Sequence, residues 1–125
     1  IEAGLDGLLF LGSLGEFYAF SDAEKRALID FAVKTAAGRT QVVIGIGHTE
    51  EAEVVRLAAH AAEAGADALN IVSPYYFGLP AAAAADYFER IGKAGGCAFI
   101  GKADVELFVE FVFRHRRKRN RFCKL

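Results

Sequence analysis

Three segments of the chain share one pattern, in which a short apolar run is followed by apolar residues at helical spacing. The runs are Leu8–Leu11, Val42–Ile44 and Ala68–Val72, and Gly or polar residues bound them. Leu8–Leu11 is uninterrupted, which is typical of a parallel strand that is covered on both faces, so we expect it to be fully buried. Because strand and helix patterns alternate along the chain, we expect an α/β fold with a parallel sheet.

The first helical segment begins with a local capping signal. Ser21 stands before it as an N-cap, Glu24 occupies the capping-box position, and Gly38 suits the C-terminal end. The apolar spacing predicts one buried face, made of Ala27, Leu28, Phe31, Ala32 and Thr35.

The next two helices are predicted from similar patterns. Thr49 is the expected N-cap of the second, ahead of the acidic residues Glu50 and Glu51, and Gly65 is expected to end it. The third spans about residues 81–93, and a further short strand is predicted over 97–100. The residues expected to face the sheet are Val54, Val55, Ala58, Ala59 and Ala62 on the second helix, and Tyr87, Phe88 and Ile91 on the third.

The composition excludes several classes of protein but does not indicate a particular reaction. The chain is 54% hydrophobic and 25% charged, as expected for a globular protein. It has no apolar run of the roughly 18 residues that a membrane span needs and no signal-peptide pattern, so we expect a cytoplasmic protein. Cys97 and Cys123 are predicted to be free thiols. His48 and His60 lack metal-ligand spacing, so neither a metal nor a cofactor is predicted.

Charge is divided unevenly along the chain. Residues 1–113 hold eight Lys and Arg against all sixteen Asp and Glu, a net charge of −8, whereas residues 114–125 hold seven Lys and Arg and no acid. We expect this basic tail to be exposed. It is either a solvated extension, a segment that binds polyanions such as nucleic acid, or sequence introduced by a frameshift or cloning junction.

Two of the predicted strands end in segments that carry chemistry. Gly12-Ser13-Leu14-Gly15-Glu16 follows the first strand, and Ser73-Pro74-Tyr75-Tyr76 follows the third. Ligands of α/β folds bind at the carboxyl ends of the strands. The same residues have simpler interpretations: the glycines form a tight turn, Glu16 accepts a structural hydrogen bond in it, and the tyrosines pack on a partner.

The order and spacing of several motifs resemble the family of dihydrodipicolinate synthase and N-acetylneuraminate lyase, which are Schiff-base aldolases and lyases. The resemblance covers roughly residues 1–94. Its motifs are the strand-end segments above together with residues 1–7, Ser21-Asp22-Ala23-Glu24-Lys25-Arg26, the stretch 38–47, and Glu63-Ala64-Gly65-Ala66-Asp67-Ala68.

The resemblance implies part of a (βα)8 barrel. Such a barrel typically needs about 250 residues, and this chain has 125. We expect residues 1–96 to form a partial TIM-barrel domain with about the second to fourth βα units, and 97–125 to be a divergent C-terminal segment with the basic tail. The sequence contains no Met, which favours a partial chain or the product of a truncated or rearranged gene.

The resemblance also implies a chemistry and roles for individual residues. The family forms an imine between a lysine and a 2-oxo acid such as pyruvate, which then reacts with, or is released from, an aldehyde. Ser13 and Tyr76 would belong to a hydroxyl relay that moves protons, with Tyr76 reaching into a neighbouring subunit, so a homo-oligomer is expected. The turn Gly12-Ser13-Leu14 would hold the substrate carboxylate through the backbone N–H groups of Ser13 and Leu14.

Three departures from the family pattern lead us to expect no activity from this chain alone. Leu14 replaces a second hydroxyl residue, the tyrosine of the family's fifth strand is absent, and its sixth-strand lysine has no secure counterpart. Lys102 is the candidate, although an ordinary surface lysine is the commoner case. The alternatives are a non-catalytic half barrel that self-associates and a basic-tailed module that binds polyanions, with membrane binding not expected.

Overall fold

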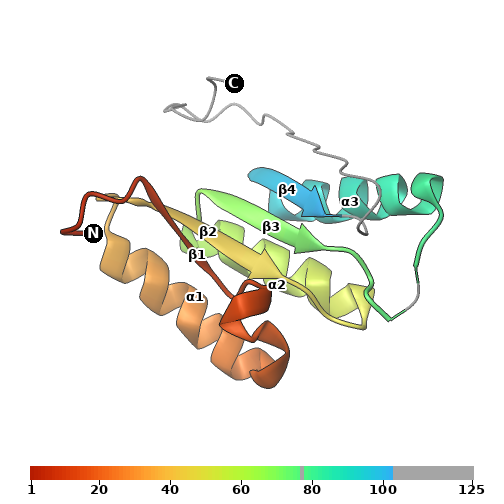
Figure 1. Ribbon diagram of the computed structural model, residues 1–125, viewed down its shortest axis with the longest axis horizontal. Coiled ribbons are helices and arrows are strands. Elements are labelled where there is room, and N and C mark those ends of the chain that lie inside the picture. Colours follow the sequence, from red (N-terminus) through yellow and green to blue (C-terminus); the bar gives the residue numbers. More distant parts are fainter. Residues whose placement is uncertain (77, 103–125) are drawn as a thin grey trace.

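A computed structural model describes residues 1–76 and 78–102 as a parallel sheet flanked by helices (Figure 1). The sheet order β1-β2-β3-β4 follows the chain, and each adjacent pair is parallel. This confirms the predicted α/β alternation and the short strand near residue 100. The strands are β1 (Gly7–Phe10), β2 (Gln41–Ile46), β3 (Ala68–Val72) and β4 (Ala98–Lys102).

In this described part of the chain, three α-helices alternate with the strands: α1 (Asp22–Ala36), α2 (Glu51–Ala64) and α3 (Ala81–Gly95). Two 3-10 turns, η1 (Ser13–Gly15) and η2 (Phe17–Ala19), lie between β1 and α1. Helix α1 packs beside α2 and α2 beside α3, so the helices form one layer against the sheet (Figure 1). The predictions about the basic tail and Cys123 concern residues outside the described ones. The domain boundary at residue 96 stays a prediction.

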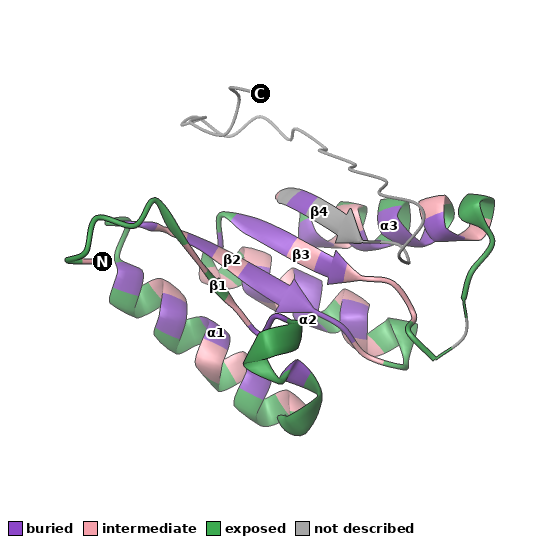
Figure 2. Ribbon diagram, viewed as in Figure 1, coloured by how far each residue is buried: buried purple, intermediate pink, exposed green. Residues whose placement is uncertain are grey.

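The core lies between this helical layer and the sheet (Figure 2). Alternate residues of the central strands are buried, as the two-residue period of a strand requires. Tyr87, Phe88 and Ile91 face them from α3, as predicted, and each is at most 2% exposed. The strand residues of this core are Val42, Ile44 and Ile46 on β2, Leu69 and Ile71 on β3, and Phe99 on β4.

The prediction that Leu8–Leu11 is a fully buried strand was wrong. The strand ends at Phe10, Leu9 is 54% exposed, and Leu11 is buried but lies past the strand end. Among the described residues β1 pairs with β2 alone, so it lies at an edge of the sheet. An edge position leaves side chains exposed that a central strand would cover.

The predicted buried face of α1 was also wrong in part. Ala32 is buried, but Phe31 is 62% exposed, and Lys25, Ile29 and Ala36 complete the face that contacts the core. The packed face is therefore turned by about one residue from the predicted one. On α2, Val54 and Ala58 are buried as predicted, whereas the other members of the fully buried set are Leu57 and Ala61.

Helix ends follow the local signals with one exception. Ser21 and Glu24 form the predicted capping box, and Gly65 ends α2 in a left-handed conformation with φ 97°. Gly38 is left-handed too, but it follows the C-cap residue Ala37. Thr49 is not the N-cap of α2: Glu50 is, and its N–H donates to His48 Nδ1 at 2.9 Å.

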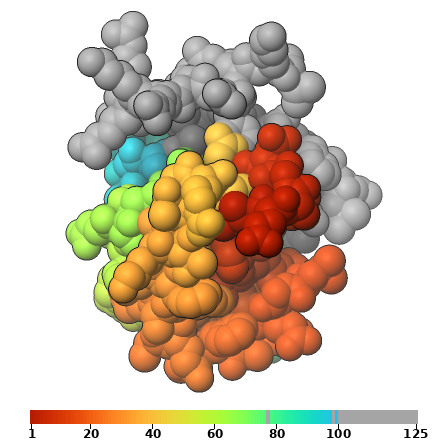
Figure 3. All heavy atoms as spheres, turned by 90° about the vertical axis from the view of Figure 1, so that its left-hand side faces the viewer, coloured from red at the N-terminus to blue at the C-terminus, as the bar shows by residue number. Residues whose placement is uncertain are grey.

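The amino ends of the strands lie at the end of the molecule opposite to the turns η1 and η2. Figure 3 views that end and shows the N-terminal segment lying against the start of β2. Thr40 Oγ1 donates to the carbonyl of Leu5 at 2.9 Å, and the Val42 N–H donates to Asp67 Oδ2 at 2.8 Å. These bonds connect three chain segments away from the candidate site.

Among the described residues, no helix is both long and apolar enough to cross a membrane. Within the same residues, no group of three or more His, Cys, Asp or Glu is placed to hold a metal ion.

Candidate active-site rim

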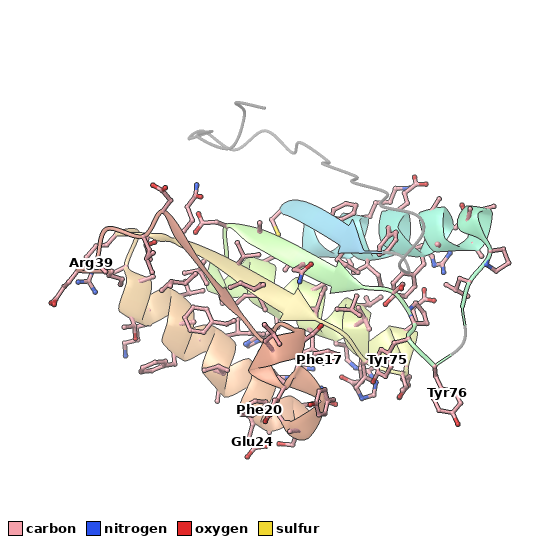
Figure 4. The ribbon with its side chains drawn as sticks, in the orientation of Figure 1. Phe17, Phe20, Glu24, Arg39, Tyr75 and Tyr76 are labelled. Atoms are coloured by element: carbon pink, nitrogen blue, oxygen red, sulfur yellow. The ribbon has the colours of Figure 1, made fainter. Side chains whose placement is uncertain are left out.

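The carboxyl ends of β1, β2 and β3 meet at one rim of the sheet, and the predicted site residues lie there. Turn η1 follows β1, residues 47–49 follow β2, and residues 73–76 follow β3. Figure 4 shows Phe17 and Tyr75 close together at this rim and Tyr76 projecting away from the sheet, whereas Arg39 lies at the opposite end. We call this surface the rim.

The turn after β1 depends on an unusual backbone conformation. Leu11 has φ 56°, in the left-handed region that branched or bulky residues seldom adopt. Beyond it, the Gly15 N–H donates to the Gly12 carbonyl at 2.9 Å. The N–H groups of Ser13 and Leu14 precede this first bond of η1, so the turn does not use them. Ser13 is exposed and Leu14 is fully exposed.

Glu16 links the two 3-10 turns through its main chain. Its φ of 51° is left-handed, its N–H donates to the Ser13 carbonyl at 3.2 Å, and its own carbonyl accepts from the Ala19 N–H at 2.8 Å. The main chain of Glu16 therefore holds η2 in place after η1, and it places Phe17 in the core, 6% exposed.

The tyrosine pair lies on the loop after β3 and the two rings differ in environment. The Tyr75 ring packs edge-on against Phe17 with 5.9 Å between ring centroids, and it is 51% exposed. Tyr76 is 78% exposed. Phe17 follows the β1 turn, so the contact between Phe17 and Tyr75 ties the two predicted site segments together.

A buried tyrosine of α3 holds the base of this loop. The Tyr87 hydroxyl donates to the carbonyl of Val72, the last residue of β3, at 3.3 Å. Burial, with a smaller contribution from the Glu51 carboxylate, raises the pKa of Tyr87 to about 12. The phenol is therefore protonated at neutral pH and remains a hydrogen-bond donor to the strand end.

A crevice of about 470 Å³ opens beside the rim, between η2, the start of α1 and the ends of β2 and β3. Aromatic rings of Phe17, Tyr18 and Tyr75 line it together with His48 and Lys25. The Lys25 side chain is 6% exposed, and its ammonium pairs with Asp22 Oδ1 at 3.2 Å. Ser13 and Tyr76 do not line the crevice, so it is distinct from the predicted relay.

Contacts between polar side chains of neighbouring helices brace the layer behind the rim. Arg90 on α3 donates two hydrogen bonds to Glu51 on α2, at 2.7 and 3.0 Å, and these lower the pKa of Glu51. His60 Nε2 on α2 lies 2.9 Å from Asp30 Oδ1 on α1. His60 is partly exposed and His48 is a loop residue, as the sequence predicted.

The described rim brings together most of the predicted site residues. Gly12, Ser13, Leu14, Gly15 and Glu16 form one turn, and Pro74, Tyr75 and Tyr76 form the loop beside it. Lys102 ends β4, next to Val72 in the strand register, and its side chain is not described. Cys97 is a free thiol, whose pKa burial raises.

Sequence reasoning missed four residues that shape the rim. They are Leu11, Gly45, Gly47 and Tyr87. A methyl group on Gly47 would lie 2.9 Å from the Phe17 ring, and one on Gly45 would lie 2.1 Å from the Leu11 carbonyl oxygen. Two glycines at the end of an apolar strand indicate such close approaches, and this signal was present in the sequence.

Comparison with known proteins assigns the chain to a family. A sequence profile described as the dihydrodipicolinate synthetase family matches residues 1–100. The chain belongs to the dihydrodipicolinate synthetase family. Curated relatives of this family include a putative 2-dehydro-3-deoxy-D-gluconate aldolase, YagE, of Escherichia coli K12, which is 42% identical over 94 residues, or 75% of this chain and 31% of the relative. A 4-hydroxy-tetrahydrodipicolinate synthase of Kosmotoga olearia is 34% identical over 119 residues, 91% of this chain and 40% of the relative.

Solved structures of the dihydrodipicolinate synthetase family match the fold. The E. coli YagE crystal structure in complex with pyruvate superposes with a TM-score of 0.76 at 37% identity, covering 80% of this chain and 34% of that one. An N-acetylneuraminate lyase from Mycoplasma synoviae gives 0.74 at 29% identity, with 80% and 35% covered. The described fold is thus part of a TIM barrel, and the chain spans about a third of the length of these relatives.

Proposed function

We propose that the rim is the carboxylate-binding and proton-relay part of an aldolase or lyase site that forms a Schiff base with pyruvate. The observation that carries this proposal is the turn from Leu11 to Glu16, held by the Gly15–Gly12 hydrogen bond at the carboxyl end of β1. It supports the proposal because backbone N–H groups of a rigid turn stabilise anions without reorganising. The pyruvate complex of YagE, a relative whose structure matches 80% of this chain, favours the same class of substrate.

The residues of the rim have separate roles in this proposal. The N–H groups of Ser13 and Leu14, next to Gly12, bind the carboxylate, and Leu14 contributes no hydroxyl. The Ser13 hydroxyl accepts and returns a proton in a relay with the Tyr76 phenol, which requires both groups within hydrogen-bond reach of the substrate. Because Tyr76 projects from the rim and is 78% exposed, we assign it to the site of a neighbouring subunit in a homo-oligomer.

The amine that forms the imine is not assigned to this chain. We place this amine, together with the phenol that completes the relay, on strands that the other part of the barrel supplies. Residues 1–125 alone are then inactive toward pyruvate and an aldehyde, and the aldehyde remains unassigned because the groups that select it lie on that other part. We assign the protein to the cytoplasm.

Pyruvate binding and imine formation can be measured on the same sample. We expect titration of ¹⁵N-labelled protein with pyruvate to shift the amide signals of Gly12, Ser13 and Leu14, and expect borohydride reduction to leave the intact mass unchanged. Ser13→Ala is the matched control, because it keeps the backbone N–H while removing the hydroxyl. Unshifted signals would contradict the binding role, and a stoichiometric adduct mapped to Lys102 would show that this chain supplies its own amine.

Complementation tests the same proposal at the level of activity. A polypeptide carrying the remaining strands of a family barrel should restore cleavage or condensation when mixed with this chain, and Ser13→Ala should lower the restored rate by roughly the 10²–10⁴-fold that proton transfer contributes. If Ser13→Ala leaves the restored rate unchanged, Ser13 does not belong to the relay.

The alternatives from the sequence make different predictions. A basic module would bind heparin or DNA with a steep salt dependence, and deletion of residues 114–125 would abolish that binding. A non-catalytic half barrel would self-associate and show neither pyruvate-dependent shifts nor complementation.

A further inference from the structure

Leu11 connects β1 to the carboxylate-binding turn in a conformation that is costly for leucine. Its φ is 56°, while its side chain is only 3% exposed and belongs to the core. A chain that continued in the β conformation would extend β1 along β2. The left-handed residue instead turns the backbone out of the strand, and Gly12 follows with φ −73° and ψ 177°.

The partner of this residue is Gly45 on β2. Phe10 pairs with Ile44 in the register, so Leu11 comes next to Gly45 where the two strands part. A methyl group built on Gly45 would lie 2.1 Å from the Leu11 carbonyl oxygen, 2.6 Å from its carbonyl carbon and 3.0 Å from the Gly12 nitrogen. The turn therefore crosses the surface of β2 at a place that only a glycine leaves open.

Both features fix the same peptide group. Leu11 leaves the strand with a left-handed φ, its carbonyl lies against β2 beside Gly45, and the missing side chain of Gly45 leaves room for it. Because backbone atoms are on both sides of this contact, neither can yield as a flexible side chain would. The position of the Leu11–Gly12 peptide in turn sets where the next N–H groups, those of Ser13 and Leu14, lie at the rim.

We propose that Leu11 and Gly45 are positioning residues that set the location of the carboxylate-binding turn, an inference that rests on the proposed function. Neither touches the substrate. They act through Gly12 and Ser13, because a displacement of about 1 Å in a substrate-positioning group can lower a rate 10²-fold. Substitutions at Leu11 can separate two effects. Its buried side chain contributes to stability, and its backbone conformation sets the path of the turn.

Two substitutions at Leu11 separate these contributions. Leu11→Val keeps most of the buried apolar side chain, but a β-branched residue resists a positive φ. Leu11→Gly removes the side chain and adopts a positive φ freely. We expect Leu11→Gly to lower the free energy of unfolding more than Leu11→Val does, yet to retain pyruvate binding, whereas Leu11→Val weakens pyruvate binding tenfold or more.

Gly45→Ala gives an independent test with its own control. We expect it to shift the amide signals of Ser13 and Leu14 and to weaken pyruvate binding tenfold or more. Gly92→Ala is the matched control, because its methyl group would lie 2.2 Å from the Phe99 ring, in the contact between α3 and β4. It should lower stability and leave the Ser13 and Leu14 signals and pyruvate binding unchanged.

The test compares the loss of pyruvate affinity with the loss of stability in each variant. If pyruvate binding falls in proportion to stability across all four variants, Leu11 and Gly45 are merely structural and the inference is wrong. If the unmodified chain shows no pyruvate-dependent shift, the proposed function fails. In that case the Ser13 and Leu14 signals of Gly45→Ala and Gly92→Ala still decide whether Gly45 sets the turn.

Discussion

The helix-covered face of the sheet and the rim of the same sheet use apolar residues in opposite ways. On the covered face, Ile44, Leu69 and Ile71 are fully buried and alternate regularly along their strands. At the rim, Leu14 is fully exposed, Tyr76 is 78% exposed, and Leu11 has a left-handed φ. The covered face is arranged for packing, and the rim keeps exposed rings and a costly backbone conformation that packing alone does not require.

This difference is typical of a site held on a scaffold. Strained conformations and exposed aromatic residues gather where a molecule binds something, while the regular part of the fold supplies the stability. Substitutions on the covered face should therefore change stability, and substitutions at the rim should change binding or assembly. The following predictions test this separation, from the largest expected effect on stability to the smallest.

The largest effect is expected in the middle of the covered face. Ile71→Ala should lower the free energy of unfolding by about 2–5 kcal/mol, because it removes a buried side chain and leaves a cavity. The measurement is urea denaturation followed by circular dichroism. The rim variant Leu14→Ala is the control and should change stability by less than about 0.5 kcal/mol. Equal losses from the two variants would contradict the separation.

Tyr87 connects the two regions, and its effect depends on pH. Its pKa is raised by burial to about 12, so the folded protein holds the phenolic proton more tightly than the unfolded chain. The resulting stabilisation is complete below the ordinary pKa near 10 and is lost as the pH rises toward 12, a fall of roughly 2–3 kcal/mol. Tyr87→Phe should lack this fall.

At neutral pH, Tyr87→Phe should cost about 1 kcal/mol, because it removes the hydrogen bond to the Val72 carbonyl. The measurement is urea denaturation at several pH values from 8 to 12. Tyr18→Phe is the matched control, since Tyr18 is 67% exposed and should leave the fall between pH 10 and 12 in place. If Tyr87→Phe shows the same fall in the free energy of unfolding between pH 10 and 12 as the wild type, Tyr87 does not cause that fall.

A smaller effect on stability distinguishes the residue that caps α1 from the residue that was predicted to cap α2. Ser21→Ala should lower the free energy of unfolding by about 1 kcal/mol, because the Ser21 hydroxyl accepts the Glu24 N–H in the capping box. Thr49→Ala should change it by less than about 0.5 kcal/mol, since Thr49 does not cap α2. Thermal or urea denaturation of both variants measures the difference, and a larger loss from Thr49→Ala would contradict these assignments.

The smallest effect on stability is expected from the exposed rings of the rim. Tyr76→Ser should leave the free energy of unfolding within about 0.5 kcal/mol of the wild type, yet weaken self-association, because exposed aromatic rings are enriched at interfaces. Analytical ultracentrifugation at several concentrations measures the association. Phe31→Ser, on the exposed face of α1, is the control and should not alter it. Unchanged self-association of Tyr76→Ser would remove Tyr76 from the interface.

The sequence predicted those parts of the fold that depend on neighbouring residues. The Ser21–Glu24 capping box and the glycine at the end of α2 are local patterns, and the structure confirms both. The buried face of α1 was predicted less well, because an alanine-rich helix offers two adjacent apolar faces. Contact with the sheet selects the face with Ile29, and the long stem of Lys25 is buried beside it.

In the candidate site, too, the sequence predicted what local motifs determine and missed what contacts between distant segments determine. The resemblance to the family identified Ser13 and Tyr76 as candidates, and the structure places both after the carboxyl ends of strands. The roles of Leu11 and Gly45 depend on a close approach between two segments more than 30 residues apart. No local pattern specifies that distance, although the glycines in β2 signalled that something comes close.

The sequential strand order has a consequence for how the chain folds during synthesis. Each strand pairs with the strand of the following repeat, so β2 has its β1 partner as soon as it leaves the ribosome, and β3 and β4 add in turn to an edge that already exists. The N-terminal part of a chain is available first during synthesis, and the loop that must close before two parallel strands pair is shortest when they are consecutive strands. Growth of the nascent sheet therefore needs no segment that has yet to be translated.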